Sequence, residues 1–376
     1  MAKKWMTLWM LGLMLVFIAC GQSSKSYRTT VGEGADQITL VVLQGTPYQM
    51  GKDYGRFMKK EVNACLTQFL GAAQKAEPQR FSNAVLDSAW KAISPYVSRN
   101  FKEELRGLSE GAGIDLQTLR RAHTVPVVAD YACSGVIAWG KASANGHVYH
   151  IRNLDFVKQA HLQDYPVVVI YNPQKGIPHA VASFAGYIGA HTGINADHIA
   201  LGEKGESPAS EYPFDLNGTH FSTLFRDLLY TAQNLNQALI QMKATPFIKR
   251  YHLFVSDGNP TEEGGAKLLV SSPDSVKLRI WKDDDPTDEL APRVLKNVVY
   301  YTMKNDVAYR FLKENYGKLD AQKMIALSRA VADEGGNLCD VVYDVTSLDM
   351  WVAFAEKSQD ASQRTYVHIP LEKYFK

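Results

Sequence analysis

Hydrophobic and polar positions follow two different periods along this chain of 376 residues. After a β-branched segment at 36–43, apolar positions over 48–75 and 81–112 recur at helical spacing, and Asp115 predicts the N-cap of a helix that ends near Ala122. Past residue 130 short strand-like runs dominate, with hairpin strands at 133–139 and 148–154 joined by Asn145-Gly146. Further strands are expected at 165–171, 180–184, 199–201, 253–255, 267–270, 341–345 and 350–354, and helices at 222–232, 235–242 and 321–332. The pattern predicts an α+β fold of stacked antiparallel sheets with helices outside.

The amino-terminal segment predicts export. Lys3 and Lys4 precede an apolar stretch over 5–19, which is short for a membrane span of about 20 residues but fits a signal peptide. The stretch ends at Phe17-Ile18-Ala19-Cys20, which resembles a bacterial lipobox with Phe where Leu is more usual. This resemblance implies a signal peptide over 1–19 and acylation of Cys20, with palmitate or a similar chain. The alternative is an uncleaved anchor helix with an incidental cysteine.

The predicted lipid anchor defines location and domain boundaries. We expect an extracytoplasmic lipoprotein, in the periplasm or at the cell surface, attached to the membrane through Cys20. A polar run then suggests a flexible tether over 20–35, and a single domain is expected over 36–376.

Charge narrows the range of partners. The chain has 41 Lys and Arg against 39 Asp and Glu, and loss of Lys3 and Lys4 with the leader leaves the two signs equal. A neutral chain has no basic surface for nucleic acid, so nucleic-acid binding is not expected.

Three cysteines, Cys65, Cys133 and Cys339, remain once Cys20 is assigned to lipid. An odd number leaves at least one thiol free. Cys65 lies among the apolar positions of a helix and Cys339 precedes a strand, so core packing is the simpler interpretation of both, and a bond between them stays open. The chain contains no Walker motif, GxSxG, HExxH or CxxC, so neither a cofactor nor a metal is expected.

The candidate chemistry lies in the central hairpin. Cys133 begins its first strand, and the returning strand ends in Arg152-Asn153-Leu154-Asp155. The turn therefore brings Arg152 and Asp155 beside Cys133. A guanidinium favours the thiolate form of a nearby thiol, and a carboxylate can orient an amine. A buried cysteine beside a structural Arg–Asp pair is the alternative, and the residues alone leave both open.

Six segments in this order carry a family resemblance: Gly45–Gly51 with Gly55, Glu103–Gly113, Cys133-Ser134 with Trp139-Gly140, Arg152–Phe156, Asp340–Asp344, and Met350–Ala353. They resemble the acyl-coenzyme A:6-aminopenicillanic-acid acyltransferase-like family of cysteine N-terminal nucleophile (Ntn) hydrolases, and more distantly choloylglycine hydrolases and acid amidases. The resemblance implies the four-layer αββα Ntn-hydrolase sandwich.

The resemblance also implies a catalytic arrangement. Autocleavage between Ala132 and Cys133 would give fragments 20–132 and 133–376 that remain associated. The thiol of Cys133 would be the nucleophile and its new α-amine, with an ordinary pKa of about 7.7–8.0, the general base. Arg152 would lie beside the thiol and Asp155 would orient the amine. No cofactor or metal is implied.

The resemblance also points to two candidate oxyanion donors. Asn195 matches an asparagine that related hydrolases place near the oxyanion hole. His252 stands where they commonly carry a second asparagine, five residues before Asp257. An imidazole N–H can donate to an oxyanion, with pH sensitivity near its pKa of about 6.5. A packed histidine is the alternative.

Together these features predict a cysteine amidohydrolase that cleaves a linear amide (C–N) bond of a small N-acyl amide through a thioester on Cys133. An acyltransferase that uses the same thioester is one alternative, and a non-catalytic lipoprotein that binds acyl ligands is another. A papain-type peptidase requires a cysteine in a helix and a histidine base, whereas Cys133 begins a predicted strand.

Overall fold

The computed structural model describes residues 26–129, 132–205, 212–260, 264–270, 279–283, 285–288 and 293–376. The predicted signal peptide, Cys20 and the first part of the predicted tether lie outside this range. Within it, no helix is both long enough and apolar enough to cross a bilayer.

The amino-terminal helices follow the predicted pattern: α1 (Pro47–Phe57), α2 (Lys59–Ala76), α3 (Asn83–Ile93), α4 (Arg99–Ala112) and α5 (Leu116–Val128). The capping prediction is confirmed, since the Asp115 side chain accepts a hydrogen bond from the Thr118 N–H. The predicted end near Ala122 is wrong, because α5 continues for six more residues. That last part is rich in Val and Thr and contains Pro126, so its helical propensity is low and burial of Val125, Val127 and Val128 stabilises it instead.

The strands form two sheets among the described residues. One has nine strands in the order β1 (Tyr27–Val31), β2 (Ile38–Gly45), β5 (Pro166–Pro173), β6 (His179–Phe184), β7 (Thr192–Asn195), β8 (Ile199–Gly205), β9 (Tyr251–Asp257), β10 (Gly265–Val270) and β11 (Arg279–Trp281). The other has six, in the order β12 (Val298–Tyr301), β3 (Ala132–Gly140), β4 (Gly146–Asp155), β13 (Asn337–Asp344), β14 (Asp349–Phe354) and β15 (Val367–Pro370). Neighbours pair antiparallel except β2 and β5, which are parallel.

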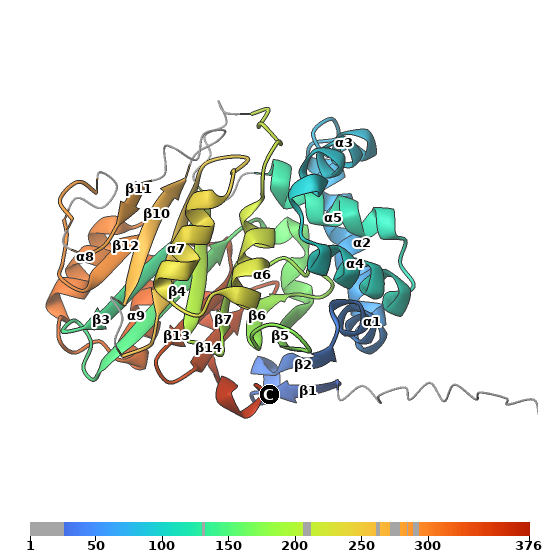
Figure 1. The fold of residues 1–376 in the computed structure, drawn as a ribbon. Helices are drawn as coiled ribbons and strands as arrows, with labels where there is room; N and C mark the ends of the chain where they lie inside the picture. The colour runs from blue at the N-terminus through green and yellow to red at the C-terminus, as the bar shows by residue number, and fades with distance from the viewer. Residues whose placement is uncertain are drawn as a thin grey trace, which may run out of the picture.

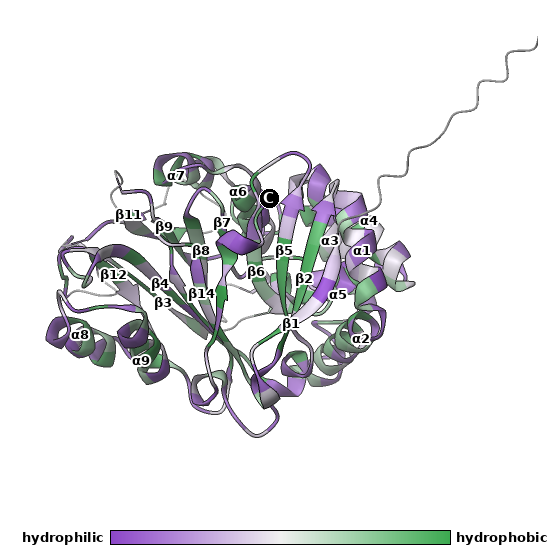
Figure 2. Cartoon of the chain, turned by 90° about the horizontal axis from the view of Figure 1, so that it is seen from below, coloured by the Kyte–Doolittle hydropathy of each residue, from purple (hydrophilic) through white to green (hydrophobic). Residues whose placement is uncertain are grey.

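The sheets pack face to face with helices outside, which confirms the predicted four-layer α+β sandwich. Helices α6 (Phe221–Thr231) and α7 (Leu235–Ala244) cover the nine-stranded sheet, and α1 packs on β2. Helices α8 (Asn305–Glu314) and α9 (Ala321–Val331) cover the six-stranded sheet. The view from below shows these layers in succession (Figure 2), and α1–α5 gather on one side of the molecule (Figure 1).

Strand β1 lies inside the segment that was predicted as a flexible tether. The tether was expected over 20–35, but Tyr27–Val31 pair with β2 and so belong to the sheet. The segment reads as polar because four of its five side chains are exposed on an edge strand. The sequence analysis also missed four short strands, β7, β11, β12 and β15, because each has only three or four residues and carries little pattern. It missed helix α8 as well.

Two of the family-like segments are explained by the crossing of α1 and α4. The Gly51 and Gly55 positions of α1 face the α4 backbone, while Gly107 and Gly111 of α4 face the α1 backbone. A Cβ at Gly107 would lie 2.0 Å from the carbonyl oxygen of Tyr48. The two helices touch backbone to backbone, which only glycine at these positions permits.

We expect Gly107→Ala to lower the free energy of unfolding by about 1–3 kcal/mol or more, because α1 and α4 must separate to admit the methyl group. Gly71→Ala is the matched control. Gly71 is also helical, in α2, but has open space around it. Alanine there should be neutral or stabilising by up to about 1 kcal/mol. Denaturant unfolding of both variants measures the difference, and equal effects would contradict the role of the helix contact.

Candidate active site

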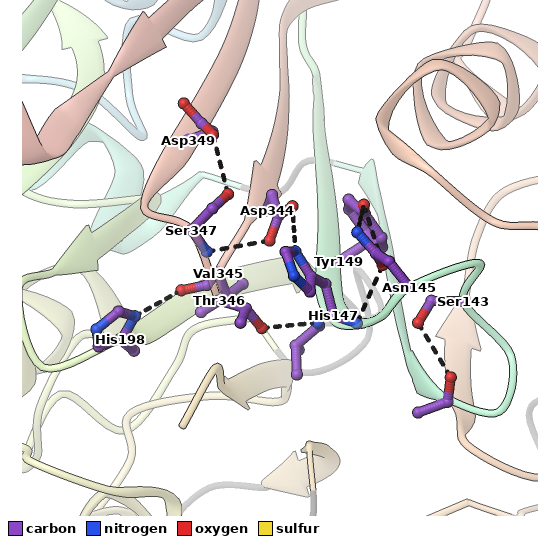
Figure 3. Close-up of polar contacts among 12 residues, drawn as sticks. Ser143, Asn145, His147, Tyr149, His198, Asp344, Val345, Thr346, Ser347 and Asp349 are labelled. Atoms are coloured by element: carbon purple, nitrogen blue, oxygen red, sulfur yellow. Dashed lines mark hydrogen bonds and ion pairs between the residues drawn. The ribbon is translucent and has the colours of Figure 1, made fainter. Parts of the chain in front are cut away.

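The hairpin of β3 and β4 places the predicted residues at its open end. Cys133 pairs with Leu154, and Gly135 pairs with Arg152. The opposite end, around the Gly140–Gly146 pair, is a polar cluster in which His147 contacts Asp344 at 2.8 Å (Figure 3). This cluster attaches the turn to the loop after β13, so it fixes the hairpin at the end remote from Cys133.

The thiol of Cys133 lies against a buried ion pair. Arg152 Nη2 donates to Cys133 Sγ at 3.1 Å and to Glu203 Oε2 at 3.2 Å, and Arg152 Nε donates to the Glu203 carbonyl oxygen. All three side chains are fully buried. Glu203 comes from β8, in the opposite sheet, so the guanidinium bridges the two sheets beside the Cys133 thiol.

Glu203 was missed by the sequence analysis. It stands two residues beyond the strand predicted over 199–201, in a strand that extends to Gly205. A single glutamate at a strand end carries no recognisable motif. Its position becomes informative only when the fold brings β8 against β4.

Burial and charge set opposing pKa shifts in this group. Burial raises the pKa of the Cys133 thiol to about 12, Arg152 opposes this rise, and the carboxylates of Glu203 and Asp155 add to it. Burial also raises the pKa of Glu203, while Arg152 and Lys249 lower it. The thiol in the uncut chain is therefore neutral and needs a base to react.

Asp155 closes the end of the hairpin. Its Oδ1 accepts from Asn337 Nδ2 at 3.0 Å and from the Asp333 N–H at 3.4 Å. Its Oδ2 is buried and has no hydrogen-bond partner among the described residues. Burial raises the pKa of this carboxyl to about 6. Asp155 pairs with Ala132 across the ladder, so the vacant acceptor belongs to the residue opposite the predicted cleavage point.

A buried network continues from Asp155 through β13 to α9. Asn337 Nδ2 also donates to Asp340 Oδ1 at 2.6 Å, and Asp340 Oδ2 lies 2.7 Å from the Tyr366 hydroxyl. Tyr366 contacts Ser328 Oγ at 3.0 Å, which in turn contacts Asn153 Oδ1 at 2.6 Å. Burial raises the pKa of Asp340 to about 8. None of these connections was visible in the sequence.

A small cavity of about 70 Å³ adjoins Arg152. Most of its walls are apolar or aromatic; the lining residues are Phe69, Val125, Pro126, Ala129, Arg152, Leu154, Phe156, Leu162, Phe184, Tyr187, His191 and Phe221. His191 is buried and neutral, since burial and Arg152 hold its pKa well below the ordinary value. Two of the lining residues are neighbours of Cys133: Leu154 is its cross-strand partner, and Arg152 donates to its thiol.

Asn195 is used within the fold. Its Nδ2 donates to the Ala232 and Leu229 carbonyl oxygens at 2.8 and 3.4 Å, and its Oδ1 accepts from the Asp197 and Ile199 N–H groups. Both amide hydrogens are therefore directed at backbone. We do not retain the expectation that Asn195 donates to an oxyanion, because its geometry makes it a support for the β7–β8 turn.

His252 lies on β9 opposite Lys204. Its ring meets the edge of Tyr301 with 4.5 Å between centroids, and Tyr301 pairs with Gly135, two residues after Cys133. Burial and nearby cations hold the pKa of His252 well below the ordinary value, so the ring is neutral. Its role as an oxyanion donor stays a prediction.

The other cysteines are buried. Cys65, Cys133 and Cys339 are all free thiols. Cys339 pairs with Leu154 from the side opposite Cys133, so the two thiols lie two strands apart, about 10 Å, which is too far for a disulfide. Burial raises the pKa of Cys65 and of Cys339. Among the described residues no group of three or more His, Cys, Asp or Glu side chains is arranged to hold a metal ion.

Comparison with known proteins gives distant similarity. No family model matches the chain. The chain is 28% identical to protein dcd1B of Dictyostelium discoideum, over 90% of this chain and 72% of that protein. It is 26% identical to the N-acylethanolamine-hydrolyzing acid amidase of Oryctolagus cuniculus, over 43% of this chain and 46% of the amidase. A solved Caenorhabditis elegans ortholog of that amidase aligns with a TM-score of 0.46 at 14% identity, covering 62% of this chain and 99% of its own.

Proposed function

We propose that the protein is an autoproteolytically activated cysteine amidohydrolase, which cleaves the linear amide bond of a small N-acyl amide through a thioester on Cys133. The observation that carries the proposal is the buried contact of 3.1 Å between the Cys133 thiol and the guanidinium of Arg152, a residue that lines an apolar cavity. The similarity to an acid amidase that by its name hydrolyses N-acylethanolamines supports the reaction class.

The first step is cleavage of the chain at Cys133. The thiol attacks the carbonyl carbon of Ala132, the peptide C–N bond breaks, and the acyl group moves from nitrogen to sulfur. Water then hydrolyses the thioester, which leaves a carboxylate on Ala132 and a free α-amine on Cys133. The vacant Oδ2 of Asp155, on the residue opposite Ala132, supplies an acceptor for an N–H of that amine.

The same groups then act on substrate. The free amine takes the proton of the thiol as the sulfur attacks the substrate carbonyl, and returns it to the leaving amine. Arg152 stabilises negative charge on the sulfur and on the developing oxyanion. Water releases the acyl group as a carboxylic acid. Transfer of the acyl group to a second amine uses the same thioester and remains the alternative outcome.

The two fragments are expected to stay together after cleavage. Strand β2 of the first fragment pairs with β5 of the second, inside the nine-stranded sheet. Glu104 of α4 and Arg226 of α6 form a buried bidentate ion pair between the fragments. The Lys249 ammonium donates to the Pro126 and Ala129 carbonyl oxygens, just before the proposed cleavage point. These contacts do not involve the bond that breaks.

The lipid anchor is part of the proposal. The first strand begins at Tyr27, seven residues after Cys20. A linker of that length spans at most about 25 Å. An acylated Cys20 would therefore hold the catalytic domain close to the membrane surface.

The substrate test uses N-acyl amides that differ only in acyl length. Because the cavity walls are mainly apolar, each added methylene that still fits should raise kcat/KM about fourfold, the equivalent of about 0.8 kcal/mol. A charged acyl group should be hydrolysed poorly. The uncleaved Cys133→Ala variant is the matched blank. Cleaved protein that hydrolyses none of the series would contradict the proposal, and products diverted to an added amine would favour acyl transfer.

A further inference from the structure

The buried network that runs from Asp155 to α9 has more contacts between oxygen atoms than it has hydroxyl protons to form them. Three oxygen-to-oxygen contacts follow one another: Asn153 Oδ1 to Ser328 Oγ at 2.6 Å, Ser328 Oγ to the Tyr366 hydroxyl at 3.0 Å, and Tyr366 to Asp340 Oδ2 at 2.7 Å. Each contact needs one proton. The serine and tyrosine hydroxyls supply two.

Neighbouring backbone groups fix which atoms donate. Asn153 Nδ2 donates to the Ser328 carbonyl oxygen at 2.8 Å, so its Oδ1 faces the serine hydroxyl and only accepts. Ser328 must therefore donate to Asn153, and Tyr366 must donate to Ser328. The tyrosine oxygen then has only acceptor capacity left for Asp340, so the missing proton belongs on Asp340 Oδ2.

The other end of Asp340 is fixed in the same way. Asn337 Oδ1 accepts from the Ser362 N–H at 2.8 Å, so its Nδ2 faces both carboxyl groups. One hydrogen goes to Asp340 Oδ1 and the other to Asp155 Oδ1. Only in this orientation can the Asn337 amide donate to Asp340 and to Asp155 at the same time.

We propose that Asp340 is a protonated carboxylic acid that holds Asn337 in place, and through it orients Asp155 toward the nitrogen of Cys133, which is the leaving group in autocleavage and the free amine afterwards. Asp340 is thus a positioning residue for the proposed amidase, and its role in catalysis depends on that proposed function. Because Asp340 is neutral, Asp155 carries the only negative charge of these two acids, and it is the carboxylate that faces the amine.

The charges around Asp340 fit the neutral state. Its charged and titratable neighbours are Asp155 and Arg152 of β4, Cys339 of its own strand, Tyr366, and Arg329 of α9, which lies over the Tyr366 ring. Arg152 is already paired with Glu203. Burial and Asp155 together raise the pKa of Asp340 to about 8, in agreement with the proton count.

Infrared difference spectroscopy tests the proton directly. The uncut Cys133→Ala protein is compared with Cys133→Ala/Asp340→Asn at pH 6, so the measurement needs no cleavage. We expect the difference spectrum to contain the carbonyl band of one buried carboxylic acid, because Asp155 is present in both proteins and its contribution cancels, and we expect this band to be lost as pH rises past about 8. A difference spectrum without this band at pH 6 would overturn the proposal.

Autocleavage of otherwise unaltered protein tests the positioning role. Asparagine reproduces the neutral acid, since its NH₂ can donate to Tyr366 and its oxygen can accept from Asn337. Asp340→Asn should therefore cleave within about threefold of the unaltered rate at pH 7, whereas Asp340→Ala should be slower by about tenfold or more. The unaltered protein should also slow above about pH 8, where Asp340 ionises and can no longer donate to Tyr366, while Asp340→Asn should not.

Equal loss of cleavage in the asparagine and alanine variants would show that the charge of Asp340, not its proton, is required. If the unaltered protein does not cleave at all, the proposed function fails, while the infrared result still decides the protonation of Asp340.

Discussion

Purified protein that begins after the predicted leader is expected to separate under denaturing conditions into two chains. The larger should begin at Cys133 and contain 244 residues, about 27 kDa in proportion to the 41.9 kDa of the whole chain. Cys133→Ala should remain a single chain, because the substitution removes the thiol that is proposed to attack the Ala132 carbonyl. Intact mass and amino-terminal sequencing measure the outcome.

The control for this result is another buried thiol. Cys339 lies on the same sheet face as Cys133 and flanks the same residue, Leu154, but has no arginine within hydrogen-bond distance among the described contacts. Cys339→Ala should therefore cleave normally and lose only packing. A single uncut chain in the unaltered protein would contradict the proposed enzyme. Cleavage in Cys133→Ala would contradict the assignment of the nucleophile.

Local sequence patterns predicted most of the fold because its longer elements agree with them. The hairpin is the best example, since both of its apolar strands were predicted, although the connection runs over 141–145 and Gly146 pairs with Gly140 in place of forming the turn. The patterns could not show β1, whose exposed edge position makes a strand look like a linker, or the end of α5, where buried contacts override low helical propensity.

The site was predictable only where its residues share the hairpin. Cys133, Arg152 and Asp155 come together because β3 and β4 pair. Glu203, Asn337 and Asp340 arrive from other strands, and no local pattern signals a buried carboxylate whose partner is far along the chain. Asn195 is an example of the opposite failure. Its motif matches that of related hydrolases, but its side-chain hydrogen bonds do not support the oxyanion role that the match implies.

The second large effect is expected at the Arg152–Glu203 pair. Arg152→Met should abolish autocleavage and also lower the free energy of unfolding by about 3–5 kcal/mol, because it leaves a buried glutamate without its partner. Without Arg152 the folded-state pKa of Glu203 rises further above its unfolded value. Stability from such a group is present at low pH and is lost as pH rises, so the penalty should grow by up to about 1.4 kcal/mol per pH unit until Glu203 ionises.

A double variant separates catalysis from stability. Arg152→Met with Glu203→Leu removes both charges and fills the space with apolar atoms, so it should regain most of the stability lost in Arg152→Met. It should still fail to cleave, because the thiol has lost the cation that stabilises its charged form. Urea unfolding at two pH values, with mass analysis of the same samples, measures both effects. Cleavage by the stable double variant would show that Cys133 reacts without the ion pair. Arg152 would then stabilise the fold and have no part in the reaction.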